Sequence, residues 1–176
     1  IGGIAQFAVF FGVLLLITLG LPRRELCGLH RPHSWPRAIG YMVGGLIAIF
    51  VVGAALSPFL DAGEEQGIVP DEWDPDRAGA FIAFGFVATL VAPIVEELMF
   101  RGVGFALFSP YGAWVAILAT GVLFGAYHGL LIALPVLATF GVVLGWLRHA
   151  TGSVYPCIAL HAIFNGIAIA SVPLFA

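Results

Sequence analysis

Long apolar stretches with almost no charge constrain the fold of this chain more than any other feature of its sequence. Of its residues, 61% are hydrophobic and only 10% are charged, whereas soluble domains carry about 25% charged residues. A membrane-spanning helix needs about 20 consecutive apolar residues. The sequence therefore predicts an all-α fold, a polytopic transmembrane helical bundle in one membrane domain over residues 1–176, with about six spans at roughly 4–21, 38–60, 78–100, 113–131, 132–147 and 154–174.

The boundary between the fourth and fifth predicted spans is the least distinct, because Gly129 is the only plausible break near residues 128–132. Pro135 then falls just inside the following helix, where proline is tolerated. Small residues spaced four apart also permit close contact between helices, and such pairs occur at Gly40/Gly44, Gly121/Gly125 and Gly141/Gly145.

The charged loops predict the orientation of the bundle. Basic loops stay in the cytoplasm, and the segment 22–37 carries Arg23, Arg24, Arg31 and Arg37. The acidic segment 61–77 then lies outside by alternation, as a solvated connector without assigned function. We therefore expect a multi-pass protein of the cell membrane, the inner membrane in bacteria, with its catalytic motif on the cytoplasmic side.

Composition also limits the partners. The net charge is −3 and there is no basic patch, which excludes nucleic acid as a partner. The two cysteines, Cys27 and Cys157, show no metal-ligand spacing, so the sequence predicts neither a disulfide nor a metal pair. The expected partners are membrane lipid and a peptide or membrane-protein substrate. Because the first residue is Ile1 rather than Met, we expect further residues to precede it.

Ionisable residues within the apolar region are the candidates for function. Between Arg77 and Arg148 the only acidic or basic residues are Glu96, Glu97 and Arg101, and the histidines His128 and His161 lie in later spans. Such groups cost several kcal/mol in a bilayer unless they are paired or hydrated. A purely structural pair needs one acid and one base, so the extra carboxylate and the histidines indicate a functional site.

The spacing of these residues predicts which of them pair. Glu97 and Arg101 are one turn apart on the same helix face, so they can form an ion pair. Glu96 lies about 100° around the helix from Glu97 and is left without that partner. Pro93 removes the backbone hydrogen bond to Thr89 and favours a kink before the glutamates.

Two carboxylates, two imidazoles and an amide are the parts of a hydrolytic site. A carboxylate and an imidazole can take the proton of a water that attacks a carbonyl. A second histidine with an amide, here His161 and Asn165 one turn apart, can donate hydrogen bonds to the developing oxyanion. No G-x-S-x-G motif supplies a serine nucleophile. The spacing alone leaves open which glutamate is the base.

Three ordered motifs on separate predicted spans resemble the CPBP family (CAAX protease and bacteriocin-processing, also called Abi). Glu96-Glu97-Leu98-Met99-Phe100-Arg101 is similar to its EExxxR motif, and Phe124 to His128 is similar to its FxxxH motif. His161 to Asn165 is similar to its HxxxN motif. The resemblance covers a catalytic core over residues 80–170.

The resemblance implies a glutamate-dependent intramembrane endopeptidase similar to the CAAX prenyl endopeptidase. It implies that Glu96 activates water together with His128, and that His161 and Asn165 bind the oxyanion. It further implies that Glu97 and Arg101 support the site as a pair, with no cofactor and no metal. The natural substrate stays open, since peptide pheromones, bacteriocin leaders and membrane-protein tails all fit.

Two alternatives remain open at the level of sequence. Glu97, His128 and His161 could ligate zinc, although there is no H-E-x-x-H motif and Arg101 would repel a cation. The chain could instead be a non-catalytic bacteriocin-immunity or membrane scaffold protein. A proton-coupled transporter is disfavoured, because such folds are usually built from repeats and the sequence has none.

The depth of the histidines poses a geometric question. If the fourth span starts at residue 113 on the cytoplasmic side, His128 lies about 22 Å along its helix, whereas His161 lies only about 10 Å deep. The two can meet only if helices tilt or if the fourth span begins outside the bilayer. In the second case residues 101–112 form part of the roof of the site.

Overall fold

The computed structural model describes residues 2–60 and 74–175, and every regular element in these ranges is helical. This confirms the all-α prediction. Most of the acidic segment, residues 61–73, lies outside the described residues. The helices are α1 (Gly2–Ile17), α2 (Arg23–Leu26), α3 (Trp35–Leu56) with η1 (Ser57–Phe59), η2 (Pro75–Arg77), α4 (Ala78–Phe86), η3 (Val87–Val91), α5 (Ala92–Glu97), η4 (Leu98–Gly104), α6 (Phe105–Phe108), η5 (Ser109–Tyr111), α7 (Ala113–Tyr127), α8 (Leu134–Thr151) and α9 (Tyr155–Phe175).

Each of the six predicted spans contains a helix, but within the described residues only four helices are long and apolar enough to cross a membrane. These four are Trp35–Phe59, Pro75–Tyr111, Leu134–Thr151 and Tyr155–Val172. The first and fourth predicted spans, 4–21 and 113–131, appear as shorter apolar helices, Gly3–Ile17 and Ala113–Tyr127. The expectation of about six full spans is therefore reduced to four long candidates and two shorter helices.

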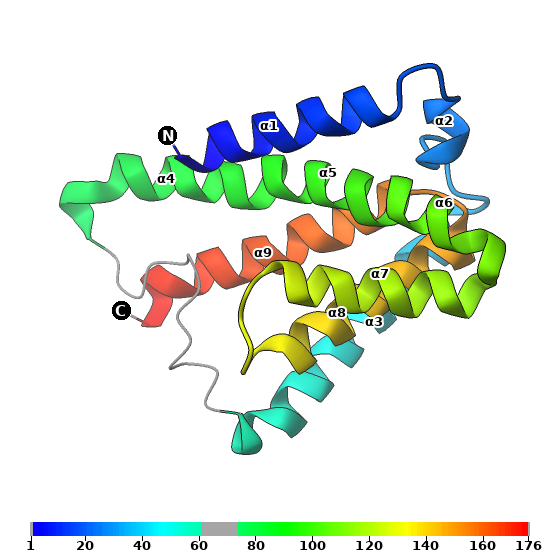
Figure 1. Cartoon of the computed structure of the whole chain (residues 1–176). Helices are drawn as coiled ribbons and strands as arrows, with labels where there is room; N and C mark the ends of the chain where they lie inside the picture. Colours follow the sequence, from blue (N-terminus) through cyan, green and yellow to red (C-terminus); the bar gives the residue numbers. More distant parts are fainter. Residues whose placement is uncertain (1, 61–73, 176) are drawn as a thin grey trace.

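The third predicted span continues well beyond its expected end near residue 100. From η2 to η5 the chain forms one helix of 37 residues, Pro75–Tyr111, drawn in green along α4, α5 and α6 in Figure 1. At a rise of about 1.5 Å per residue this helix is about 55 Å long, whereas the hydrocarbon core of a bilayer is about 30 Å thick. Its charged motif therefore lies in the interior of the helix rather than at its end.

Two π-helical segments, η3 and η4, flank α5 and its glutamates. The N–H of Ala92 donates to the carbonyl of Val87, five residues back. The next N–H in this pattern belongs to Pro93, which has none, so the carbonyl of Ala88 lacks a donor at that position. From α-helical spacing, the sequence predicted that the carbonyl of Thr89 would lose its donor. In the structure the affected carbonyl is that of Ala88, and the side chain of Asn165 donates to it. π-bulges are frequent at functional sites.

Helices α7 and α8 form a tight antiparallel hairpin. Gly129, with φ of 69°, lies in the turn between them, and Pro135 is in the first turn of α8, as predicted. The glycine pairs of α7 and α8 face one another: a Cβ on Gly125 would lie 2.8 Å from the main-chain nitrogen of Ala138. The absence of side chains at these positions lets the two backbones come close, as the glycine spacing predicted.

Gly121→Ala is expected to lower the free energy of unfolding by about 1–3 kcal/mol, because it overpacks this contact. A Cβ at this position would lie 2.7 Å from the main-chain nitrogen of Val142 and 2.9 Å from its Cα. Reversible unfolding in mixed detergent micelles measures the change. Gly44→Ala is the matched control, since a Cβ on Gly44 meets nothing within 4 Å. Equal effects of the two substitutions would contradict the packing argument.

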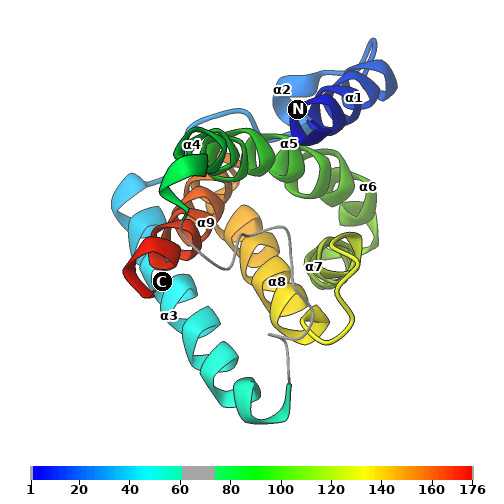
Figure 2. The ribbon, with the colours of Figure 1, turned by 90° about the vertical axis from the view of Figure 1, so that its left-hand side faces the viewer.

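Helix α8 lies at the centre of the bundle, with α3 and α9 on one side and α7 on the other, while α1 lies at the periphery (Figure 2). A buried apolar cluster surrounds the middle of α8 and consists of Ile49, Phe124, Phe140, Leu144, Leu147, Cys157 and Leu160. Large apolar side chains are exposed on the outer faces of α1, α3 and α7, which is the pattern expected of a surface that faces lipid.

The basic segment 22–37 packs against the end of the bundle where α8 ends and α9 begins. The N–H of Val154 donates to the carbonyl of Gly28 at 3.0 Å, and the hydroxyl of Ser153 donates to the carbonyl of His30 at 2.6 Å. A Cβ on Gly102 would lie 3.1 Å from the Cβ of Cys27. The basic loop and the charged motif are therefore neighbours at one end of the bundle.

Candidate active site

The charged motif of the long helix is buried between helices of the bundle. Glu97 and Arg101 have no exposed surface, Glu96 is 5% exposed and His161 of α9 is 2% exposed. The glutamates lie on α5 and Arg101 on η4. Helices distant in the sequence thus enclose ionisable groups, which protein interiors tolerate only when these groups are paired and hydrogen-bonded.

Glu97 is the central member of the cluster. Its Oε1 accepts a hydrogen bond from Arg101 Nη1 at 3.1 Å and another from His161 Nδ1 at 2.9 Å. The ion pair between Glu97 and Arg101 was predicted from their spacing and is confirmed. The contact with His161 joins α9 to the long helix. Because a carboxylate only accepts hydrogen bonds, His161 carries a proton on Nδ1.

Arg101 is held by two further groups from other helices. Its Nη2 donates to the carbonyl of Gly141 at 2.6 Å. Its Cζ lies 4.6 Å from the centre of the Phe124 ring, within the range of a cation–π interaction. The α7–α8 hairpin thus supplies a carbonyl and an aromatic face to the guanidinium. The glycine at position 141 serves both the helix contact and this hydrogen bond.

Glu96 is the spare carboxylate that the helix geometry predicted. Its Oε2 lies 3.9 Å from His161 Nε2, too far for a hydrogen bond. In the described part of the chain this buried oxygen has no hydrogen-bond partner. A buried carboxylate oxygen in this state is available to a polar ligand such as a water molecule.

His128 lies at the C-terminal end of α7 with a defined hydrogen bond. Its Nδ1 is 2.8 Å from the carbonyl of Phe124; because a carbonyl only accepts, Nδ1 is the donor and the lone pair of the neutral ring is on Nε2. The main-chain N–H of His128 donates to Gly125 instead, which leaves the Phe124 carbonyl for the ring. Among the described residues no hydrogen bond or ion pair joins His128 to Glu96.

The register of α7 answers the question of depth. The rings of Phe100 and Phe124 lie 5.4 Å apart, and a Cβ on Gly104 would lie 3.5 Å from the side chain of Thr120. Each step of four residues along one helix is matched by four residues back along the other. One turn beyond the pair of Phe100 and Phe124, this register therefore places His128 at the level of Glu96. His128 reaches the site because the long helix continues to Tyr111 and α7 runs back along it.

Phe124 is the residue whose importance the sequence understated. Its ring packs against His128 at 4.7 Å, His161 at 5.4 Å and Phe140 at 5.8 Å between centroids. It is a buried packing residue, but two of the rings that it contacts belong to the ionisable residues His128 and His161. Its place as the first residue of the FxxxH motif was the signal that it belongs to the site.

The side chain of Asn165 forms its hydrogen bond with the main chain and not with the other polar side chains of the site. Its Nδ2 donates to the carbonyl of Ala88 at 2.8 Å, the carbonyl that Pro93 deprives of a donor. The amide therefore secures η3 against α9. Its second N–H is not part of this bond.

Asn165→Leu is expected to lower the free energy of unfolding by about 1–3 kcal/mol, because the Ala88 carbonyl loses its donor inside the bundle. Unfolding in mixed micelles measures the change. Ser171→Ala serves as the control, since the Ser171 hydroxyl is exposed and bonds only within its own helix, to Ala168. An unchanged stability of Asn165→Leu would show that another group replaces the amide at Ala88.

The arrangement of donors bears on the zinc alternative. Glu97, His128 and His161 do not converge as a metal site, and the described ranges 2–60 and 74–175 contain no group of three or more His, Cys, Asp or Glu side chains placed to hold a metal ion. Of the two carboxylate oxygens of Glu97, Oε2 has no hydrogen-bond partner among the described residues, whereas Oε1 already accepts hydrogen bonds from Arg101 and His161. A cation at this oxygen would also be repelled by the adjacent guanidinium.

Comparison with known proteins agrees with the motifs. Residues 78–167, just over half of the chain, match the family model described as Type II CAAX prenyl endopeptidase Rce1-like. Neither the curated proteins nor the solved structures gave a significant match to the chain. The matched residues include both glutamates, Arg101, His128, His161 and Asn165, so the resemblance to the CPBP (Abi) family is confirmed. This match, together with the buried glutamate cluster, shows that the chain belongs to the Rce1-like type II CAAX prenyl endopeptidase family, a family of membrane hydrolases.

Proposed function

We propose that this chain is a glutamate-dependent intramembrane endopeptidase in which Glu96 is the general base. The observation that carries the proposal is the state of Glu96: it is buried, it is free of the Arg101 ion pair, and its Oε2 has no hydrogen-bond partner among the described residues. A carboxylate in this state can bind a water molecule and accept its proton. Family membership supports the reaction class.

The proposed reaction begins with a water molecule bound between Glu96 and His128. Glu96 takes a proton from the water as the water oxygen attacks the scissile carbonyl. The C–N bond of the tetrahedral intermediate then breaks as Glu96 passes this proton to the leaving amine. His128 suits the second position at the water because its Nδ1–H is held by Phe124 and Nε2 has the lone pair.

The remaining polar groups are proposed to stabilise the charge that develops on the carbonyl oxygen. His161 can donate through Nε2 when both ring nitrogens are protonated, since Nδ1 is directed at Glu97. Asn165 can contribute its second N–H. Preorganised donors of this kind are usually a large part of catalysis in acyl transfer. Glu97 and Arg101 hold His161 in place and take no proton in this scheme.

The proposed substrate is a peptide or the tail of a membrane protein, reached from the cytoplasmic side. The position of the site supports this, because the basic segment 22–37 packs at the same end of the bundle as Arg101 and basic loops stay in the cytoplasm. We further propose that the chain acts as a single membrane domain in the cell membrane.

The test is cleavage of a quenched fluorescent peptide library by the purified protein in nanodiscs, with and without EDTA. Glu96→Gln serves as the inactive reference, and Glu25→Gln, an exposed glutamate on α2, serves as the matched control. Cleavage that persists in EDTA and is lost only in Glu96→Gln supports the proposal. Cleavage that is lost in EDTA and restored by zinc would replace it with a metalloenzyme. Binding of peptides without cleavage would favour the immunity or scaffold function.

A further inference from the structure

The end of α8 carries an arginine that the reaction scheme does not use. Arg148 is partly buried, and among the described residues it forms no ion pair. Its Nε donates to the main-chain carbonyl of Arg101 at 3.0 Å. Charged side chains inside a membrane protein pair with one another or with backbone carbonyls, and the partner of Arg148 is a carbonyl of the charged motif itself.

Arg148 bonds to a carbonyl within the π-helical segment η4. The N–H of Phe105 donates to the carbonyls of Phe100 and Gly102, so it does not serve the Arg101 carbonyl that an α-helix would assign to it. Arg148 supplies a donor at this carbonyl from a different helix. A guanidinium that donates to a carbonyl forms a stronger bond than a neutral amide does.

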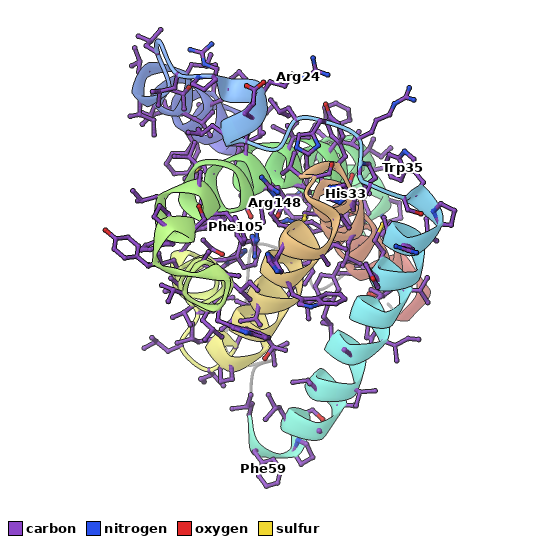
Figure 3. The ribbon with its side chains drawn as sticks, turned by 90° about the vertical axis from the view of Figure 1, so that its right-hand side faces the viewer. Arg24, His33, Trp35, Phe59, Phe105 and Arg148 are labelled. Carbon is purple, nitrogen blue, oxygen red and sulfur yellow. The ribbon has the colours of Figure 1, made fainter. Side chains whose placement is uncertain are left out.

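Two groups confine the Arg148 side chain. Its Cζ lies 5.4 Å from the centre of the Phe105 ring, and Figure 3 shows the two side chains together inside the bundle, while Arg24 lies at its edge. The guanidinium also lies against Gly28, with φ of +64°, where a Cβ would lie 2.6 Å from the Cζ of Arg148. A Cβ here would displace the guanidinium, and the positive φ also favours glycine. The bond from Val154 N–H to the Gly28 carbonyl holds this segment in place.

Helix α8 thereby holds Arg101 at two points. Gly141 accepts from the Arg101 side chain, and Arg148, two turns later on the same face of α8, donates to the Arg101 main chain. Since Arg101 in turn fixes Glu97, and Glu97 fixes His161, the position of both ends of Arg101 determines the geometry of the cluster. We propose that Arg148 is a positioning residue for the Glu97–Arg101–His161 cluster, an inference that rests on the proposed endopeptidase function for its effect on rate.

The test compares Arg148→Gln and Arg148→Lys with Arg24→Gln, an exposed arginine whose side chain makes no hydrogen bond in the described part of the chain. On a peptide that the wild type cleaves, Arg148→Gln is expected to lower kcat between about tenfold and 100-fold, because small misplacements of catalytic groups have effects of this size. KM is expected to stay within about twofold, since Arg148 does not contact substrate in this scheme. Arg148→Lys keeps a charged donor and is expected to recover part of the loss.

A second measurement does not depend on activity. The chain has five histidines, so the ring ¹⁵N signals of His161 can be assigned by comparison with His161→Asn in nanodiscs. Arg148→Gln is expected to shift the His161 Nδ1 signal, because its hydrogen bond to Glu97 changes, whereas Arg24→Gln leaves it unchanged. A merely stabilising arginine would lower the unfolding free energy without moving this signal.

The outcomes separate the two proposals. Unchanged His161 signals with unchanged kcat, or a change in KM alone, would overturn the positioning role. If the wild type cleaves no peptide, the proposed function fails, while the His161 signal still decides the role of Arg148. If Arg148→Gln does not fold, Arg148→Lys gives the same comparison, because it retains the charge but changes the geometry of the donor.

Discussion

Replacing Glu96 with glutamine is expected to lower kcat for peptide cleavage by about 10³-fold, within the range attributed to general acid–base groups. Glutamine has nearly the same shape as glutamate, but its amide cannot take a proton from water. The rest of the cluster should persist, because Glu96 makes no hydrogen bond to Glu97, Arg101 or His161 in the structure. Steady-state kinetics in nanodiscs, on one peptide selected from the library, measures the loss.

Two controls make this result specific. Glu25→Gln removes an exposed carboxylate from α2 and is expected to leave kcat within about twofold, as surface substitutions usually do. The unfolding free energy of Glu96→Gln is expected to equal or exceed that of the wild type, because the substitution removes a buried carboxyl group whose Oε2 has no hydrogen-bond partner among the described residues. If Glu96→Gln kept a tenth or more of the wild-type kcat, Glu96 could not be the base.

Arg101→Met is expected to lower the free energy of unfolding by about 3–5 kcal/mol, the usual cost of breaking a buried ion pair from one side. Arg101 has no exposed surface and bonds both Glu97 and the Gly141 carbonyl. Methionine fills much of the same volume but leaves the Glu97 charge uncompensated. The four tryptophans of the chain provide a fluorescence signal for reversible unfolding in mixed micelles.

The double variant Glu97→Gln/Arg101→Met separates charge from packing. It removes both charges, and glutamine is chosen in place of Glu97 because its amide oxygen can still accept from His161 Nδ1. We expect the double variant to lose less stability than the sum of the two single losses, with a coupling energy of about 1–3 kcal/mol in the double-mutant cycle. Additive effects of the two substitutions would show that the ion pair is not the main contribution of Arg101. Activity is expected to remain low, because His161 loses a charged partner.

Several features of the site could be predicted from local sequence alone. The ion pair of Glu97 and Arg101 follows from helical spacing, and Glu96 is left over for the same reason. The scarcity of charge between Arg77 and Arg148 identified the cluster, since a bilayer tolerates few ionisable groups without a purpose. Gly129 and Pro135 marked the turn between α7 and α8 through their backbone preferences.

Other features depend on contacts between residues distant in the chain. His161 bridges to Glu97, Asn165 bonds to the Ala88 carbonyl, and Arg148 bonds to the Arg101 carbonyl. None of these partners is set by helical periodicity, which tells which residues share a face but not which helix lies opposite. Asn165 is the clearest example of a contact that the sequence did not predict. The sequence placed it beside His161, whereas in the structure its amide donates to a carbonyl in the π-helical segment η3.

The sequence by itself determined that this chain is a helical membrane protein with its ionisable residues on three separate helices, because hydropathy and the 3.6-residue period act locally. The tertiary structure alone decided that the long helix continues to Tyr111, so that α7 returns and brings His128 level with Glu96. It also decided that α8 holds Arg101 at both ends. The physical reason is that helix length and register are set by packing and by hydrogen bonds to carbonyls in π-helical turns, which depend on several helices at once.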